Sequence, residues 1–262
     1  MTTPDPSLRL ANASPGADDP APEIFRSLQG EGRSAGAVRT FIRLSGCNLH
    51  CVWCDTAYTW NWIGSPHAHV RDAPGRPHQF DPRREIAALP VSQVAAQALA
   101  LQAPGYVITG GEPLVQERGV LALIERIKTA QPGAWVEIET NGALAPDPAL
   151  LAAVNQFNVS PKLAHSGNAT ATAINADALA AYAPHPGAFL KIVARTPRDL
   201  DDADAVVAAA GFSPERVDIM PEGTDSETLR RRARALAEPC LARGYGLSDR
   251  LHVHLFGARR GV

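Results

Sequence analysis

Most of the sequence alternates segments that predict β-strands with segments that predict α-helices. Short apolar runs typical of buried strands occur at residues 38–45, 106–109, 135–139, 157–159, 189–193 and 217–220. Runs that predict helices occur at residues 91–103, 114–130, 146–154, 176–182, 199–210 and 226–244. Such alternation forms parallel βαβ units, and six of them predict an α/β fold of the barrel or partial-barrel type. Residues 251–255 predict one last strand.

This pattern predicts a single folded domain at residues 23–262. Residues 1–22 are rich in Pro, Ala, Asp and Ser, so we expect a flexible tail or an edge segment there, with residues 7–11 as the candidate strand. Residues 63–84 hold several prolines and glycines and predict a loop insertion. A connection of this length inside a compact domain is usually functional or disordered.

The composition limits the function classes. The chain has 25 Lys and Arg against 27 Asp and Glu, a net charge of −2, which argues against a strongly basic nucleic-acid binder. No apolar run approaches the length of a membrane helix, and the first residues do not resemble a signal peptide. We therefore expect a cytoplasmic protein with neither a nucleic-acid nor a membrane partner.

Polar, turn-forming residues follow five of the predicted strands. The carboxyl ends of parallel strands meet on one face of an α/β fold, where the functional site lies. One such segment alone would indicate only an ordinary turn, but five together predict a shared site. The five segments are residues 46–47, 110–113, 140–142, 160–162 and 221–224.

Three of the four cysteines lie close together, as Cys47, Cys51 and Cys54 in a CxxxCxxC spacing. A structural zinc site normally has four protein ligands, and a histidine from residues 50, 67, 69 or 78 would have to complete it. A redox pair of Cys51 and Cys54 would leave Cys47 without a role. Three thiolates on a [4Fe-4S] cluster leave one iron open to a small molecule. Cys240 lies in a predicted helix and indicates a packed core residue.

The cysteine spacing, with Trp53 before the last cysteine, resembles the cluster motif of radical S-adenosylmethionine (SAM) enzymes. The segment Gly110-Gly111-Glu112-Pro113 resembles the GGEP motif of the same superfamily. We expect the glycines to let the backbone approach a ligand, and the Glu112 carboxylate to accept from the amino group of SAM. The resemblance implies a partial (βα)6 barrel of the TIM type.

Further motifs resemble the 7-carboxy-7-deazaguanine synthases within this superfamily. They are the segments 28–32, 55–56, 139–142 and 160–162, together with Arg43 and Trp60. The similarity covers the chain from about residue 23 onward, apart from residues 63–84. It implies the ring contraction of 6-carboxy-5,6,7,8-tetrahydropterin to 7-carboxy-7-deazaguanine with loss of ammonia, in queuosine or other 7-deazapurine biosynthesis. In such enzymes SAM supplies a radical that takes a hydrogen from the substrate, and the cofactor does the difficult chemistry.

The resemblance also implies roles for individual residues. Cys47, Cys51 and Cys54 would hold the cluster, and Thr56 would bind Mg²⁺, which prefers oxygen ligands; Asp55 is expected to cap the next turn. Lys162 would pair with an oxygen of SAM, unless it is a surface lysine. The residues expected around SAM are Gly110, Gly111, Glu112, Asn141, Ser160, Pro161, Lys162, Met220, Pro221, Glu222 and Gly223.

For the substrate, Arg43 offers a bidentate fork to the carboxylate. Its alternative is an ion pair inside the barrel with Glu31 or Glu139. The histidines at 252 and 254 are expected to be structural. The residues expected to contact the substrate are Leu28, Gln29, Gly30, Arg43, Thr109 and the terminal Val262.

Two other functions remain open at this point. An activating enzyme for glycyl-radical enzymes shares the cysteine and GGEP motifs, although residues 29–32 and 54–56 argue against it. A non-catalytic iron–sulfur or zinc module belongs to a different class. For an enzyme, the resemblance implies a flavodoxin or ferredoxin as the reductant and a homodimer as the assembly.

Overall fold

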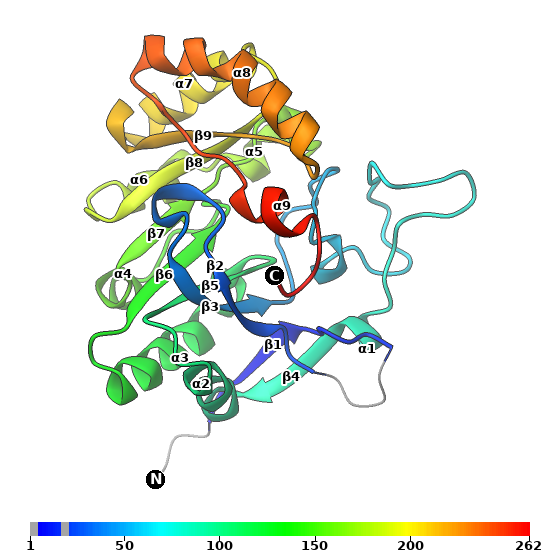
Figure 1. The fold of residues 1–262 in the computed structure, drawn as a ribbon, viewed down its shortest axis with the longest axis vertical. Helices are drawn as coiled ribbons and strands as arrows, with labels where there is room; N and C mark the ends of the chain where they lie inside the picture. Colours follow the sequence, from blue (N-terminus) through cyan, green and yellow to red (C-terminus); the bar gives the residue numbers. More distant parts are fainter. Residues whose placement is uncertain (1–4, 17–20) are drawn as a thin grey trace.

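The computed structural model describes residues 5–16 and 21–262. Its sheet has the strand order β10-β9-β8-β7-β6-β5-β3-β1-β4, with β2 paired to β3 beside this path (Figure 1). The strands are β1 (Ser7–Ala11), β2 (Ile24–Leu28), β3 (Val38–Leu44), β4 (Ile86–Pro90), β5 (Gly105–Gly110), β6 (Trp135–Thr140), β7 (Gln156–Val159), β8 (Ala188–Ala194), β9 (Val217–Pro221) and β10 (Gly246–Leu247). The helices are α1 (Pro82–Glu85), α2 (Val91–Ala100), α3 (Glu117–Ala130), α4 (Pro148–Ala153), α5 (Thr170–Ala173), α6 (Ala176–Tyr182), α7 (Asp199–Ala210), α8 (Ser226–Arg243) and α9 (Leu251–Phe256).

Six strands, β3 and β5 to β9, are parallel neighbours, and they correspond to the six predicted strands. The sheet does not close on itself, because β10 and β4 end it on opposite sides. The helices α2 to α4 and α6 to α8 follow the outside of the curved sheet (Figure 1). The prediction of an α/β partial barrel of six units is therefore confirmed.

The strands have one apolar and one polar face, which follows from the alternation of side chains along a strand. In β8, Leu190 and Ile192 are fully buried in the core under the helices. Lys191, between them, faces the inside of the barrel, where it pairs with Glu31 and Glu139. The barrel interior is thus lined with charges, and the apolar core lies between the sheet and the helices.

The helices begin and end where their sequence signals indicate. The carboxylates of Asp147 and Asp225 accept hydrogen bonds from backbone N–H groups of α4 and α8, at 2.8 Å each, so they are N-caps. α7 and α8 end at Gly211 and Gly244, both with a φ of 71°. This left-handed conformation costs glycine little.

The predicted strand at residues 251–255 is wrong, because these residues form the helix α9. Their alternating Leu, His and Val residues imitate a strand, but only Val253 is buried. The last strand is β10, two residues long and earlier in the chain.

Three strands, β2, β4 and the two-residue β10, were not predicted at all. Residues 7–11 form β1, which pairs with both β3 and β4 and so lies inside the sheet and not at its edge. Leu8 and Leu10 of β1 are fully buried. The expectation of a flexible tail for residues 1–4 and 17–20 lies outside the described residues.

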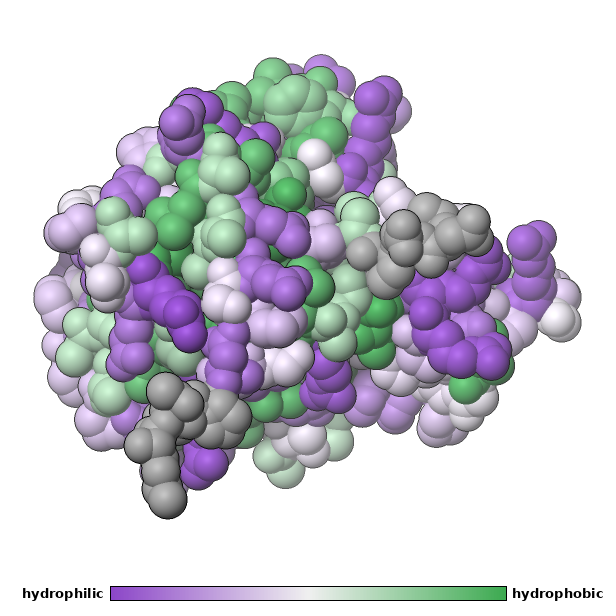
Figure 2. Space-filling model, turned by 90° about the horizontal axis from the view of Figure 1, so that it is seen from below, coloured by the Kyte–Doolittle hydropathy of each residue, from purple (hydrophilic) through white to green (hydrophobic). Residues whose placement is uncertain are grey.

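The segment of residues 63–81 forms a loop that projects from the barrel (Figure 1). Figure 2 shows mostly hydrophilic residues over this projection. A bridge between Trp62 and Phe80 joins the two ends of the loop. None of the helices in the described ranges is long and apolar enough to cross a membrane.

Candidate active site

A cavity of about 450 Å³ lies at the carboxyl ends of the parallel strands. All five predicted polar segments contribute to its wall, so the expectation of one shared site agrees with the geometry. The predicted site residues that line it are Leu28, Gln29, Gly30, Arg43, Cys47, Cys51, Cys54, Thr56, Thr109, Gly110, Gly111, Asn141, Ser160, Lys162, Met220, Pro221, Glu222, Gly223 and Val262. Glu112 and Pro161 are buried outside this wall.

The three clustered cysteines line this cavity as free thiols. Burial raises the pKa of each, that of Cys51 to about 11. Among the described residues, no three His, Cys, Asp or Glu side chains converge as ligands of a single ion do. Cysteines that hold a [4Fe-4S] cluster are spread around it, so three soft thiols around one cavity fit such a cluster. Cys240 is buried in α8, as expected of a core residue.

The cysteine loop, residues 46–55, is held from two sides. On one side, the N–H of Val52 donates to the carbonyl of Ser166 at 2.9 Å. On the other side, the N–H of Val70 donates to the carbonyl of Val52 at 2.8 Å. The buried His69 ring accepts from the N–H of Arg71 at Nδ1, so its Nε2 carries the proton and donates to the carbonyl of Cys54 at 2.9 Å. The projecting loop thus supports the cysteine loop.

The glycines of the GGEP segment are required by backbone packing. A Cβ on Gly110 would lie 2.1 Å from the carbonyl oxygen of Leu44, and one on Gly111 would lie 2.1 Å from that of Gly46. Gly110 also has a φ of 123°, which other residues rarely adopt. These glycines bring the end of β5 against the start of the cysteine loop. These two glycines are therefore required by the close packing of their backbone against residues 44 and 46, in addition to any approach of a ligand.

The structure corrects the expectation that Glu112 reaches a ligand. Its carboxylate is fully buried and accepts hydrogen bonds from the N–H groups of Leu114 and Asn141 and from the hydroxyl of Thr140, at 2.7–3.0 Å. Burial raises its pKa despite these three donors. Glu112 therefore ties the end of β5 to the end of β6 and so positions Asn141 in the cavity wall.

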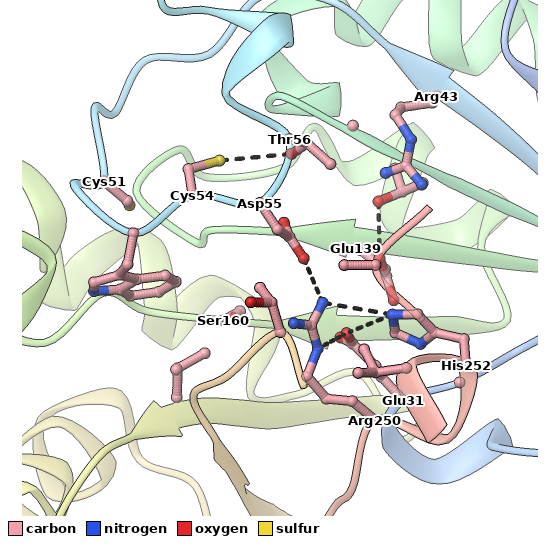
Figure 3. A pocket seen from close by; sticks show the side chains of 18 of the residues that line it. Glu31, Arg43, Cys51, Cys54, Asp55, Thr56, Glu139, Ser160, Arg250 and His252 are labelled. Atoms are coloured by element: carbon pink, nitrogen blue, oxygen red, sulfur yellow. Dashed lines mark hydrogen bonds and ion pairs between the residues drawn. The ribbon is translucent and has the colours of Figure 1, made fainter. Parts of the chain in front are cut away.

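A network of ion pairs occupies the opposite wall of the cavity (Figure 3). Lys191 Nζ lies 2.5 Å from a Glu31 oxygen and 3.2 Å from a Glu139 oxygen. Arg250 Nε lies 2.9 Å from the other Glu31 oxygen, and an Arg250 Nη pairs with Asp55. Burial alone would raise the pKa of Glu31, but the charges of Lys191 and Arg250 outweigh it and hold this pKa well below its usual range.

Two predicted side chains contact this network. The hydroxyl of Thr109 donates to Glu139 at 2.8 Å, and the amide of Gln29 donates to the same carboxylate at 3.4 Å. Asp55 does not cap a turn as expected, because Arg250 binds its carboxylate. Gly30 is needed where it stands, since a Cβ there would lie 2.0 Å from the His252 ring.

Arg43 has a different partner from the two expected from the sequence. Its Nε donates to Glu23 at 2.8 Å, and the hydroxyl of Tyr58 donates to the same carboxylate at 3.0 Å. The expected alternatives, Glu31 and Glu139, are not its partners among the described residues. Figure 3 shows the guanidinium pointing into the cavity. No described group accepts a hydrogen bond from its two terminal amino groups.

Two other predicted side chains lie beside the cysteines. Lys162 is half-buried, donates to the hydroxyl of Ser160 at 2.7 Å and lies 5.9 Å from the Trp53 ring, so it is not a surface lysine. The hydroxyl of Thr56 lies 3.5 Å from Cys54 Sγ.

Several residues of the site were missed from the sequence. A lysine in the middle of a buried strand was the available signal for Lys191. Glu31 and Glu139 were considered only as partners of Arg43. Arg250 gave no signal, because it lies next to the segment wrongly predicted as a strand, and His252 was expected to be structural. His252 borders Glu31 and Arg250, and burial lowers its pKa.

Comparisons with known proteins agree with this arrangement. Residues 28–146 match the family model described as a 4Fe-4S single cluster domain. The chain is 34% identical to a 7-carboxy-7-deazaguanine synthase of Pyrobaculum aerophilum, over 91% of this chain and 95% of that one. It is 32% identical to the enzyme of the same name from Halobacterium salinarum, over 93% and 94% of the two chains.

A solved structure shows the same fold. The crystal structure of QueE from Escherichia coli matches 93% of this chain and 95% of its own, with a TM-score of 0.62 and 24% identity. The identity to the curated relatives extends over nearly the full length of both chains. The chain therefore belongs to the family of 7-carboxy-7-deazaguanine synthases, as its motifs indicated.

Proposed function

We propose that the cavity binds 6-carboxy-5,6,7,8-tetrahydropterin and that its residues direct the ring contraction of this compound to 7-carboxy-7-deazaguanine, with loss of ammonia. Family membership makes the chain a radical SAM lyase with a [4Fe-4S] cluster. The observation that carries the residue assignment is that three free thiols and an unpaired guanidinium face line one cavity.

The cofactors would occupy the side of the cavity formed by the cysteine loop. Cys47, Cys51 and Cys54 would bind three irons of the cluster. When bound, the reduced cluster supplies the electron that cleaves SAM and so starts the radical chemistry. Ser160, with Lys162 hydrogen-bonded to it, would contact the polar groups of SAM. The other expected SAM contacts are Gly110, Gly111, Asn141, Met220, Pro221, Glu222 and Gly223, all in the cavity wall.

The substrate would occupy the side formed by the ion pairs. The free face of Arg43 would bind the carboxylate, because a guanidinium binds carboxylates through two parallel hydrogen bonds. Glu139 and Gln29 would face the N–H groups and the carbonyl of the pterin. The enclosing wall would keep water and stray hydrogen donors away from reactive species. Leu28, Gly30, Thr109 and Val262 would complete this wall.

Further parts of the proposal concern the metal, the reductant and the assembly. Thr56 would coordinate Mg²⁺ through its hydroxyl oxygen. The other ligands of the ion would be several waters and oxygens of the substrate. A flavodoxin or ferredoxin would reduce the cluster, and the chain would form a homodimer. We place the protein in the cytoplasm, where free thiols persist.

The test is an anaerobic assay of the protein reconstituted with iron and sulfide. With SAM, Mg²⁺, dithionite and 6-carboxytetrahydropterin, we expect 7-carboxy-7-deazaguanine, identified by mass spectrometry. The Cys51→Ala protein should yield none, whereas Cys240→Ala, which changes a thiol outside the cavity, should keep the activity. SAM cleavage without formation of this product would contradict the substrate assignment and would favour the activation of a glycyl-radical enzyme.

A further inference from the structure

The side chain of Asn168 lies against the cysteine loop, and no role has been assigned to it so far. Its Nδ2 donates to Cys51 Sγ at 3.3 Å and to the hydroxyl of Ser166 at 3.1 Å. Its Oδ1 accepts from the backbone N–H of His50 at 2.8 Å. Because a backbone N–H can only donate, the atom facing His50 is the oxygen and the NH₂ group faces the sulfur.

We propose that Asn168 sets the reduction potential of the cluster through its hydrogen bond to Cys51 Sγ. Hydrogen bonds to the sulfurs are among the factors that set the potential of an iron–sulfur cluster. A donor at a ligating thiolate stabilises the reduced cluster more than the oxidised one, because the reduced cluster is more negative. Asn168 therefore raises the potential, which makes the cluster easier to reduce.

The three sulfurs do not share this feature equally. The hydroxyl of Thr56 lies 3.5 Å from Cys54 Sγ, where either atom could be the donor. Asn141 Nδ2 is 4.0 Å from Cys47 Sγ and is directed instead to the Asn48 oxygen at 2.7 Å. Of the side-chain hydrogen bonds to these three sulfurs within the described residues, that of Asn168 is the shortest.

The position of Asn168 is fixed by its surroundings. Gly167, before it, has a φ of 80°, and a Cβ there would lie 2.6 Å from the Val52 side chain. The turn that carries Asn168 therefore packs directly on the cysteine loop. All three hydrogen bonds of the amide are directed to that loop or to its own turn, so its NH₂ group is held toward Cys51.

The proposal rests on the presence of the cluster but not on the identity of the substrate. It is tested by a redox titration of the reconstituted protein without substrate, followed by electron paramagnetic resonance. Asn168→Asp keeps the acceptor for His50, removes the donor and adds a negative charge, so we expect a clearly lower midpoint potential. Asn168→Ala removes the donor without adding charge and should give a smaller shift in the same direction.

Two controls distinguish a direct effect of the hydrogen bond on the potential from two other causes, a less rigid cysteine loop and a negative charge added elsewhere in the protein. Asn175→Asp makes the same change at the start of α6, where Asn175 caps the helix and contacts no sulfur; its shift should be much smaller. His69→Phe removes a hydrogen bond to the same cysteine loop, to a carbonyl and not to a sulfur, so it should speed cluster loss to a chelator without moving the potential comparably.

Equal potentials for the native protein and both Asn168 variants would overturn the proposal. So would a shift in Asn168→Asp no larger than that in Asn175→Asp, with no shift in Asn168→Ala. Should Asn168→Asp fail to retain the cluster, Asn168→Ala carries the comparison, because it places no charge beside the sulfur. Product formation is not needed for any of these readings, so they stay separate from the test of the proposed function.

Discussion

At the scale of single residues, the cavity holds several charged groups whose partners fix their protonation. Lys191 is held between Glu31 and Glu139. Burial would lower its pKa, but these two carboxylates outweigh that effect and raise it. Arg43 pairs on one side only with Glu23, whose carboxylate also accepts from the hydroxyl of Tyr58. Most of these charges are therefore neutralised within the protein, and the proposal assigns the free face of Arg43 to the substrate carboxylate.

The Arg43→Lys variant tests the binding of the substrate carboxylate. An ammonium cannot both pair with Glu23 and offer a planar fork. A hydrogen bond to a charged group contributes roughly 1.5–3 kcal/mol, so we expect substrate affinity to fall about tenfold to a hundredfold. Binding of SAM, measured by equilibrium dialysis, should change little. Arg39→Lys, on the same strand but outside the cavity wall, is the control, and an equal fall in SAM affinity for Arg43→Lys would contradict the assignment.

The Lys191→Met variant tests the ion-pair network. It leaves Glu31 and Glu139 with one cation fewer in a buried position, and breaking a buried pair costs about 3–5 kcal/mol. We expect a loss of that size in the free energy of unfolding of the cluster-free protein, measured with urea. Lys128→Met on α3, where the lysine has no ion pair in the described part of the chain, should change stability by less than about 0.5 kcal/mol. Equal stability of the two variants would contradict this view.

At the scale of elements, the strands of the barrel could be predicted and the peripheral elements could not. The six parallel strands each present an apolar face to the covering helices, and these apolar side chains give the strands a signal in the sequence. β2 and β4 are half-buried and lack this signal. The strand prediction at residues 251–255 was wrong because the segment is short. An alternation of apolar and polar residues over five positions is compatible with a strand and also with about one and a half turns of a helix.

The end of the chain is anchored across the cavity by Arg260. Its guanidinium lies 3.4 Å from the centre of the Tyr58 ring and 2.8 Å from Glu85, which precedes β4. Ala258, Arg259 and Val262 line the cavity. Arg260 therefore joins the last residues to the far side of the sheet, by a cation–π contact and an ion pair.

The Arg260→Gln variant tests this anchor. We expect a higher KM for the pterin with a smaller change in kcat, because the last residues would lose their place in the cavity wall. Arg234→Gln makes the same change at an exposed arginine of α8, outside the cavity wall and without an ion pair among the described residues, and should alter KM less. A fall in kcat alone would show that Arg260 acts on the chemistry and not on the wall.

At the scale of the whole molecule, the sequence predicted where the site lies better than how it is built. The cysteine spacing and the five polar segments indicated the cavity, because parallel strands bring their carboxyl ends together. The ion pairs could not be predicted, since Arg250 and Glu31 are 219 residues apart and only the folded chain brings them together. The pairing of Arg43 with Glu23 could not be predicted either, because nothing in the sequence around these two residues indicates that they are in contact.

The charged interior predicts how stability depends on pH. Burial, the largest cause, lowers the pKa of His252 below 6.5, so the unfolded chain takes up this proton first on acidification. The lowered pKa of Glu31 acts in the same direction below about pH 4.5. We therefore expect the free energy of unfolding of the cluster-free protein to fall from about pH 7.5 to about pH 5.5. His252→Asn should flatten this fall, and an unchanged slope would contradict the role given to His252.

The most direct test of the central claim is a crystal structure of the reconstituted protein with SAM and 6-carboxytetrahydropterin, grown anaerobically. We expect a cluster held by Cys47, Cys51 and Cys54, with the pterin between it and the ion pairs of Glu31 and Glu139. The substrate carboxylate should lie on the free face of Arg43. A pterin bound outside this cavity, or a carboxylate directed away from Arg43, would contradict it.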